Sequence, residues 1–252
     1  MTKICAEIIG TMILVFLGNG VVANVILSKT KGHSKNSNGE WLTITIGWAL
    51  AVFMGITVSA PYSGAHLNPC VTISFAIIGK FSWGMVPLYI FSQFIGAMLG
   101  SLFVWFLYKD HFLETQEEKD KLSVFVTIPS IKNFFSNFLS EVLATFIFIF
   151  ISLYLSIEGT LFLKEEKYPI GLGSLGALPS ALVVLGIVLS LGGATGAAIN
   201  PTRDLGPRII YSIIPIPGKG KSNWDYALIP ILGPIVGCVG AATLYLFLSS
   251  LS

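Results

Sequence analysis

The sequence has few charged residues. Only 11% of its 252 residues are Asp, Glu, Lys or Arg, whereas 54% are hydrophobic. About a quarter of the residues in a typical soluble domain are charged, so this composition cannot supply a water-soluble surface. The sequence therefore predicts a membrane protein. The formal net charge is +2 and the basic residues are scattered, which argues against nucleic acid as a partner.

Cysteine and histidine are also scarce. Cys5, Cys70 and Cys238 are odd in number, far apart and set in apolar segments, so they predict no disulfide framework. His66 has no partner cluster of metal-ligating residues, so neither a metal nor another cofactor is expected. The sequence also lacks a nucleophile constellation and a phosphate-binding loop, and we expect no enzyme.

Long apolar runs are abundant. A helix that crosses the hydrocarbon core needs about 20 apolar residues. The first run is too long for a secretory signal and lacks its basic flank and cleavage pattern, so we interpret it as a retained span. The fifth run is short unless residues 171–177 extend it. The six predicted spans are 4–27, 41–60, 84–108, 132–157, 178–191 and 226–248, and the polar links between them include 28–40, 109–123, 158–168 and 217–225.

Two further apolar stretches, 68–78 and 200–213, are helix-like but too short to span. At about 1.5 Å per residue, each covers about half of a 30 Å hydrocarbon core. Both start with Asn-Pro, and Asn is a favoured N-cap while Pro is a favoured first helical residue. One such motif fits a buried kink with satisfied polar groups, but two matched copies favour half-helices that begin near the membrane midplane.

The sequence also repeats itself. AEIIGTMILVF at 6–16 resembles SEVLATFIFIF at 140–150, GAHLNP at 64–69 resembles GAAINP at 196–201, and QFIGAMLG at 93–100 resembles GPIVGCVG at 233–240. Each half contains three spans, an odd number, so the second copy must enter the membrane from the opposite side. We predict an all-α membrane protein with six transmembrane helices and two re-entrant half-helices in an inverted repeat. The repeats cover about 1–110 and 132–252 of a single domain, 1–252.

The meeting of two helix N-termini predicts which kind of solute can pass. Each N-terminus carries about half an elementary positive charge, so cations and hydronium are repelled where the two meet. The side-chain amides of Asn68 and Asn200 can donate hydrogen bonds to a solute, and backbone carbonyls before them can accept. This pattern favours passage of a neutral solute that carries hydroxyl groups. The residues predicted to supply these carbonyl acceptors are Gly64, Ala65, His66, Gly196, Ala197 and Ala198.

SGAHLNPCVT at 63–72, TGAAINPTRDLGPR at 195–208, AEIIGT and the repeat resemble the major intrinsic protein family, the aquaporins and glycerol facilitators. The resemblance covers nearly the whole chain. It implies an aquaporin-like fold in the lipid bilayer, usually as a homotetramer with one pore in each protomer. It also implies a plasma-membrane channel with both termini in the cytoplasm, which passes glycerol, water and small uncharged solutes and excludes ions and protons.

The resemblance assigns residues to two constrictions. The central one falls on Asn68, Pro69, Cys70, Asn200, Pro201 and Thr202, and the outer one falls on Trp48, Val188, Ala197 and Arg203. The family usually has Ala at Cys70 and Thr202, and we hypothesise that the Cys70 sulfur lies beside the central constriction and makes it sensitive to thiol reagents. The outer set resembles that of the plant nodulin-26-like branch, whereas typical glycerol facilitators combine Trp and Arg with Phe and Gly.

Other positions resemble the family's glycerol-conducting members, namely Tyr108, Asp204, Arg208, Pro230 and Ile231. Asp204 and Arg208 are four residues apart and could pair on the half-helix, either buried or as a solvated surface pair. Glu7 and Glu141 resemble buried acids that brace the re-entrant loops by accepting backbone hydrogen bonds, and their alternative is a carboxylate at the membrane interface.

A coupled secondary transporter is the main rival, because transporters also use inverted repeats and broken helices. It needs a titratable group deep in the bundle, and only Glu7 and Glu141 offer themselves. The orientation implied by the resemblance also conflicts with the positive-inside tendency. It leaves Lys3, Lys80, Lys164 and Lys167 in the cytoplasm and the other basic residues outside.

Overall fold

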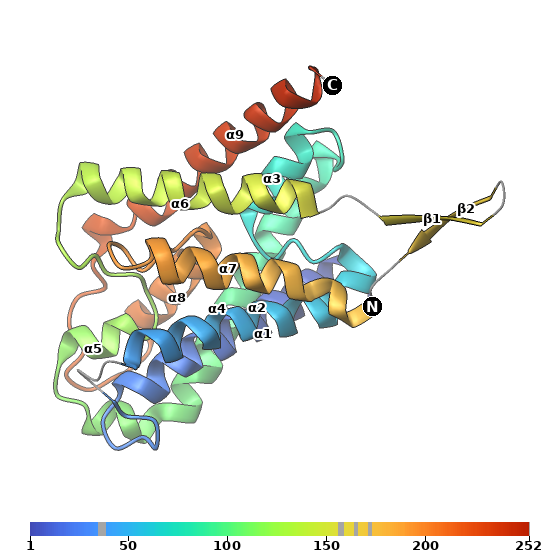
Figure 1. Cartoon of the computed structure of the whole chain (residues 1–252). Coiled ribbons are helices and arrows are strands. Elements are labelled where there is room, and N and C mark those ends of the chain that lie inside the picture. Colours follow the sequence, from blue (N-terminus) through green and yellow to red (C-terminus); the bar gives the residue numbers. More distant parts are fainter. Residues whose placement is uncertain (35–38, 156–158, 164–165, 171–172, 252) are drawn as a thin grey trace.

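Six long apolar helices lie alongside one another in the computed structural model, which describes residues 1–34, 39–155, 159–163, 166–170 and 173–251, with backbone alone in 159–163 and 166–170 (Figure 1). Helices satisfy their own backbone hydrogen bonds, which lipid requires. The helices are α1 (Lys3–Ile26), α2 (Glu40–Ser63), α4 (Val86–Glu114), α6 (Phe134–Leu155), α7 (Leu178–Leu191) and α9 (Ile229–Ser249). The six predicted spans and the all-α fold are confirmed. A 3₁₀ turn, η2 (Gly173–Ala177), lengthens the fifth span to 19 residues.

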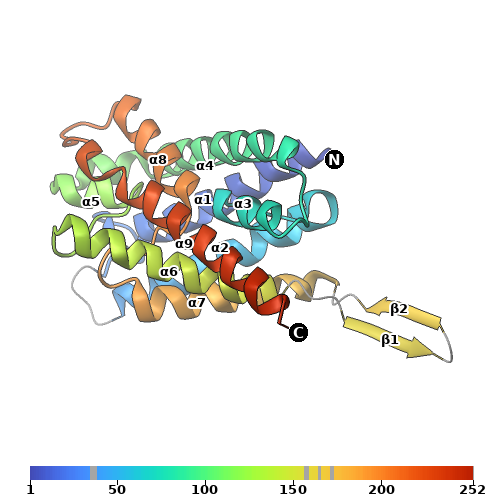
Figure 2. The ribbon, with the colours of Figure 1, turned by 90° about the horizontal axis from the view of Figure 1, so that it is seen from above.

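Two shorter helices, α3 (Pro69–Ile77) and α8 (Pro201–Ile213), lie between the long ones. α3 lies toward the end of the bundle that carries both chain termini, and α8 lies toward the opposite end (Figures 1 and 2). Their amino ends are joined by the hydrogen bonds described below. They are therefore two half-helices that enter from opposite sides, as the repeat predicts.

The two halves of the chain pack in the same way. α1 packs on α2 and α4, and α6 packs on α7 and α9. A Cβ atom built on Gly96 of α4 would lie 2.4 Å from the carbonyl oxygen of Ile8, and one built on Gly237 of α9 would lie 2.3 Å from that of Val142. Only glycine permits so close an approach of two helix backbones. Both halves therefore depend on a glycine at a close contact between two helices.

The links contain structure that the sequence pattern did not predict. α4 continues past a kink at Tyr108 (φ −106°, ψ 18°) through residues 109–114, and a short helix, α5 (Glu118–Ser123), follows. The extension is stabilised by a tertiary contact, because buried Phe112 stacks on Phe125 at a centroid distance of 5.6 Å. The remaining short helical turns are η1 (Trp83–Met85) and η3 (Trp224–Tyr226).

A small hairpin lies between α6 and α7, the fourth and fifth spans of the chain. Its strands are β1 (Gly159–Leu163) and β2 (Glu166–Ile170), which pair antiparallel with Gly159 opposite Ile170. It projects from the end that carries the chain termini (Figure 1). The strands overlap the predicted link 158–168, and β2 extends two residues beyond it.

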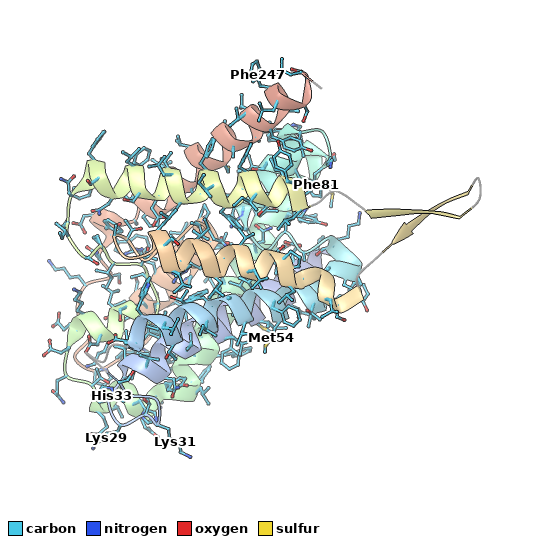
Figure 3. The ribbon with its side chains drawn as sticks, viewed as in Figure 1. Lys29, Lys31, His33, Met54, Phe81 and Phe247 are labelled. Atoms are coloured by element: carbon cyan, nitrogen blue, oxygen red, sulfur yellow. The ribbon has the colours of Figure 1, made fainter. Side chains whose placement is uncertain are left out.

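The bundle is apolar on its sides and polar at its ends. Large hydrophobic side chains such as Met54 and Phe247 are exposed along the helices, while Lys29, Lys31 and His33 gather at the end opposite the chain termini (Figure 3). A soluble protein would not leave so much apolar surface in water. The arrangement fits a bundle whose sides face lipid.

Candidate pore and its two constrictions

Asn68 and Asn200 cap the two half-helices. Asn68 Oδ1 accepts the N–H of Cys70 at 2.9 Å, and Asn200 Oδ1 accepts the N–H groups of Thr202 and Arg203 at 3.2 Å each. Both residues have extended backbone, and each is followed by a proline. These are the features of an N-cap, in which a side-chain oxygen satisfies free amide donors.

The same two side chains also join the half-helices. Asn68 Nδ2 donates to the carbonyl oxygen of Ile199 at 2.9 Å, and Asn200 Nδ2 donates to that of Leu67 at 2.9 Å. A side-chain amide has two N–H groups, so each asparagine keeps one for another acceptor. The two N–H groups that remain belong to residues that line one cavity.

The loops before both half-helices adopt the same unusual backbone. Non-glycine residues with positive φ are strained at about 1–3 kcal/mol each, so the surrounding structure must hold them in place. The positive φ angles are 81°, 52° and 51° at Gly64, Ala65 and Leu67, and 87°, 45° and 43° at Gly196, Ala197 and Ile199.

Glu7 holds the first loop. Its carboxylate is fully buried and accepts the N–H groups of His66 at 3.0 Å and Leu67 at 2.9 Å, as well as the hydroxyl of Ser63 at 2.6 Å. The carboxylate therefore supplies acceptors for donors that the strained backbone cannot satisfy itself.

Glu141 holds the second loop in the same manner. Its fully buried carboxylate accepts the N–H groups of Ala198 at 3.0 Å and Ile199 at 3.1 Å, and the hydroxyl of Thr195 at 2.7 Å. The match to Glu7 extends to each donor's place in the loop. Neither carboxylate is exposed at the surface of the bundle.

Gln93 belongs to this network although sequence analysis did not single it out as a site. Its Nε2 donates to Glu7 at 2.8 Å and to the Thr72 hydroxyl at 3.0 Å. The sequence shows the stretch 93–100 only as part of the repeat. Its contact with the loop depends on how α4 packs, which no local pattern reports.

A cavity of about 1350 Å³ passes beside the crossed loops. Its wall includes Trp41 at the start of α2 and Pro61 near its end, and at 1.5 Å per residue these positions are about 30 Å apart. That distance matches the thickness of the hydrocarbon core. The six residues predicted to supply carbonyls, Gly64, Ala65, His66, Gly196, Ala197 and Ala198, all line it.

The charges on the cavity wall are positive. Lys3, Lys80 and Lys119 lie on it toward the ends, and Arg203 lies within it, whereas no Asp or Glu belongs to the part of the wall that the structure describes. The amino ends of α3 and α8 add partial positive charge. The cavity therefore opposes the entry of a cation.

Trp48, Val188, Ala197 and Arg203 all line this cavity, and they come from α2, α7, the second loop and α8. The guanidinium carbon of Arg203 lies 4.3 Å from the centroid of the Trp48 ring. Arg203 Nη1 is buried without a hydrogen-bond partner among the described residues. One guanidinium nitrogen of Arg203 therefore has no acceptor among the described residues, and the guanidinium lies against an aromatic face.

Comparison with known proteins agrees with this arrangement. A model of the major intrinsic protein family matches residues 1–245. The chain belongs to the major intrinsic protein family. It is 45% identical over 245 residues to the probable glycerol uptake facilitator protein of Thermotoga maritima, with 97% of this chain and 98% of that protein covered. It is also 45% identical over 249 residues to the glycerol uptake facilitator protein of Streptococcus pneumoniae, with coverages of 97% and 98%.

Among solved structures, the aquaglyceroporin from Plasmodium falciparum superimposes with a TM-score of 0.80 at 32% identity. The match covers 96% of this chain and 94% of that one. The aquaporin-like fold of this major intrinsic protein therefore extends over nearly all of its length.

In this major intrinsic protein, Asp204 and Arg208 form a buried pair. Arg208 Nε and Nη2 donate to Asp204 Oδ1 at 2.9 and 2.6 Å, and both side chains are fully buried. Asp204 Oδ2 accepts the N–H and hydroxyl of Thr127, and Arg208 Nη1 donates to the carbonyls of Ser222 and Asn223. The solvated alternative is wrong. The pair ties α8 to the links that precede α6 and α9.

The other residues that resemble the glycerol-conducting pattern lie away from the cavity. Tyr108 is at the kink of α4, and Pro230 and Ile231 are in the first turn of α9. None of the three, and neither Asp204 nor Arg208, lies on the described cavity wall. Any influence of these residues on the solute is therefore indirect.

The expectation that Cys70 borders the lumen is wrong. Its side chain is fully buried in a cluster that includes Cys238 of α9, and it does not line the cavity. Thr202 does not line it either, and its hydroxyl instead donates to Asn200 Oδ1 at 2.9 Å. Pro69 and Pro201 are also off the wall. Only the asparagine of each motif faces the cavity, because the residues after it turn into the helix and its packing.

Thiol reagents are therefore not expected to change conduction by reacting with Cys70. Mercurial treatment should change glycerol flux equally in the parent protein and in Cys70→Ala, with exposed Cys5 as the accessible thiol and Cys5→Ala as its control. Flux in proteoliposomes, with thiol labelling quantified, tests this. A block that disappears only in Cys70→Ala would show that the sulfur reaches the lumen.

His66 forms part of an aromatic vestibule that sequence analysis did not identify. Its ring lies 5.3, 4.7 and 5.1 Å from those of Phe75, Phe81 and Tyr89, and all four residues line the cavity. Phe81 lies toward the end of the bundle near α3 (Figure 3). These residues come from the first loop, α3, the link after it and α4, so their proximity is a product of the fold.

Proposed function

We propose that this protein is a passive transmembrane channel that facilitates diffusion of glycerol, water and other small neutral solutes, and that it excludes ions and protons. The main support is the cavity, which passes the crossed Asn68 and Asn200 caps and the outer constriction at Trp48 and Arg203. The names of the relatives as glycerol uptake facilitators support glycerol as the solute.

The lining suits a polyol. The Trp48 face, Val188 and Ala197 offer apolar contact to the carbon backbone, and Arg203 offers donors to hydroxyl groups. At the central constriction, each asparagine offers its remaining N–H, and loop carbonyls offer acceptors. A solute can replace its hydrogen bonds to water by hydrogen bonds to these groups as it passes. It is not tightly held, because no group attracts it with a full opposite charge.

Proton exclusion follows from the same groups. A water molecule that accepts hydrogen bonds from both asparagines directs its oxygen toward them, and the chain of proton transfers is interrupted there. The amino ends of α3 and α8 raise the energy of hydronium at the same depth, and the charge of Arg203 raises it at the outer constriction.

Coupled transport is the rival function, and the structure disfavours it. Glu7 and Glu141, the two candidate coupling groups, are occupied by loop donors and do not line the described cavity. A coupling group must exchange protons or bind an ion as the solute passes. Carboxylates that brace backbone amides are poorly placed for that task.

Light scattering from proteoliposomes tests the function. We expect glycerol and water flux with weak temperature dependence, no early saturation and no response to a proton or sodium gradient. A glycerol flux that saturates early and follows either gradient would instead identify a transporter. Empty liposomes of the same lipid are the control.

We also propose a single channel domain of two repeats, 1–110 and 132–252, assembled as a homotetramer with one pore per protomer in the plasma membrane. Cross-linking in native membranes tests the assembly. A monomer with full conductance would contradict it.

Both termini are proposed to be cytoplasmic. Several lysines of the opposite end have structural partners, which explains their presence outside despite the positive-inside tendency. Lys219 Nζ donates to the carbonyls of Tyr211, Ser212 and Ile214 at 2.5–3.0 Å, and Lys132 pairs with Asp225. Lys164 and the side chain of Lys167 lie outside the described residues. Cleavage within 28–40 by protease added to intact cells supports this orientation, and protection of that link would reverse it.

A further inference from the structure

We propose that Gly18, which does not line the pore, sets the width of the outer constriction by providing the surface against which the Trp48 ring rests. This inference depends on the proposed function, because it treats Trp48 as part of the constriction that selects the solute. Gly18 is buried in α1, and Trp48 is only 7% exposed in α2.

The contact between Gly18 and Trp48 leaves no space for a side chain. A Cβ atom built on Gly18 would lie 2.3 Å from Cζ3, 2.4 Å from Cε3 and 2.5 Å from Cη2 of Trp48. Ordinary van der Waals contact requires about 3.5 Å or more between carbon atoms. A methyl group at residue 18 therefore demands a shift of about 1 Å in the indole or in the two helices.

The two helices are also in close contact at a pair of glycines. A Cβ atom built on Gly55 of α2 would lie 2.9 Å from the carbonyl oxygen of Gly10 of α1, so their backbones are already in close contact there. Packed interiors resist displacement, whereas the cavity beside Trp48 is unfilled by protein. The indole is therefore the part that moves, and it moves into the lumen that it shares with Arg203.

The pattern along α1 supports this assignment. Leu14, Val22 and Ile26 line the cavity and, together with Gly18, are spaced by four residues along the helix, so the four lie on one face. Gly18 alone among them is missing from the wall, and Trp48 is the side chain that covers it. The Trp48 indole therefore packs against Gly18, the one position in this row without a side chain.

Gly18→Ala is expected to lower the glycerol permeability of each channel about tenfold, the discrimination that one methylene group provides in a fitted site. Water permeability should fall less, because water needs a smaller opening, so the ratio of glycerol to water permeability decreases. Both are measured by stopped-flow light scattering on proteoliposomes with a known channel content. Gly20→Ala is the matched control, since a Cβ atom there meets nothing within 4 Å, and its ratio should stay unchanged.

Two further variants separate the possible outcomes. Trp48→Phe removes the ring edge that meets residue 18, so Gly18→Ala combined with Trp48→Phe should regain the glycerol permeability of Trp48→Phe alone. If Trp48→Phe changes the ratio and Gly18→Ala does not, the inference about Gly18 is wrong while the constriction stands. If Trp48→Phe leaves the ratio unchanged as well, the proposed constriction is wrong.

Failure of Gly18→Ala to fold is also informative. Recovery of folded protein in the double variant would place the clash at Trp48 and support the inference. A double variant that also fails to fold would show that residue 18 is limited by another contact, which overturns the inference.

Discussion

Glu141→Ala is expected to abolish glycerol conduction and to lower the free energy of unfolding by about 3 kcal/mol or more. The substitution leaves the N–H groups of Ala198 and Ile199 and the hydroxyl of Thr195 without their acceptor. Each buried donor left unpaired costs about 1–3 kcal/mol. The strained φ angles at Ala197 and Ile199 then lose the bonds that hold them. Glycerol flux in proteoliposomes and thermal unfolding in detergent measure the two effects.

Two controls make this result specific. Glu117→Ala removes an exposed carboxylate and should change neither quantity. Glu141→Gln keeps one oxygen acceptor and should lie between the parent and Glu141→Ala. Because Glu7 makes the corresponding bonds to the first loop, Glu7→Ala should have a similar effect. Normal flux and stability in Glu141→Ala would show that the loop holds its shape without the carboxylate.

Asp204→Ala should destabilise the protein by about 3–5 kcal/mol, the usual effect of removing one partner of a buried ion pair. The charge of Arg208 would stay buried and lose its partner, and the N–H and hydroxyl of Thr127 would lose their acceptor. Thr127 lines the cavity. Glycerol flux should therefore decrease together with the midpoint of thermal unfolding.

The effect of breaking the buried pair can be distinguished from the effect of removing a charge. Asp204→Ala combined with Arg208→Leu removes both charges and should recover part of the lost stability, because no uncompensated ion remains buried. Asp225→Ala breaks the exposed pair with Lys132 and should have little effect, since solvent screens that pair. If Asp204→Ala is no less stable than Asp225→Ala, the buried pair does not stabilise the protein.

The spans, the half-helices and their caps could be predicted from sequence because their causes are local. The length of an apolar run decides whether a helix can cross the membrane, and Asn68-Pro69 and Asn200-Pro201 start a helix wherever they lie. The repeat then implied that two such starts face each other. The paired hydrogen bonds from Asn68 to Ile199 and from Asn200 to Leu67 show that they do.

Other features depend on contacts between residues far apart in the chain, and no local pattern reports them. The direction of Cys70 toward α9, the bridge from Gln93 to Glu7, and the aromatic rings around His66 are examples. In each case the residue type is compatible with several environments, and the packing of a distant helix selects one. The packing of Trp48 on Gly18 has the same origin, because the sequence does not show which side chain packs against a glycine.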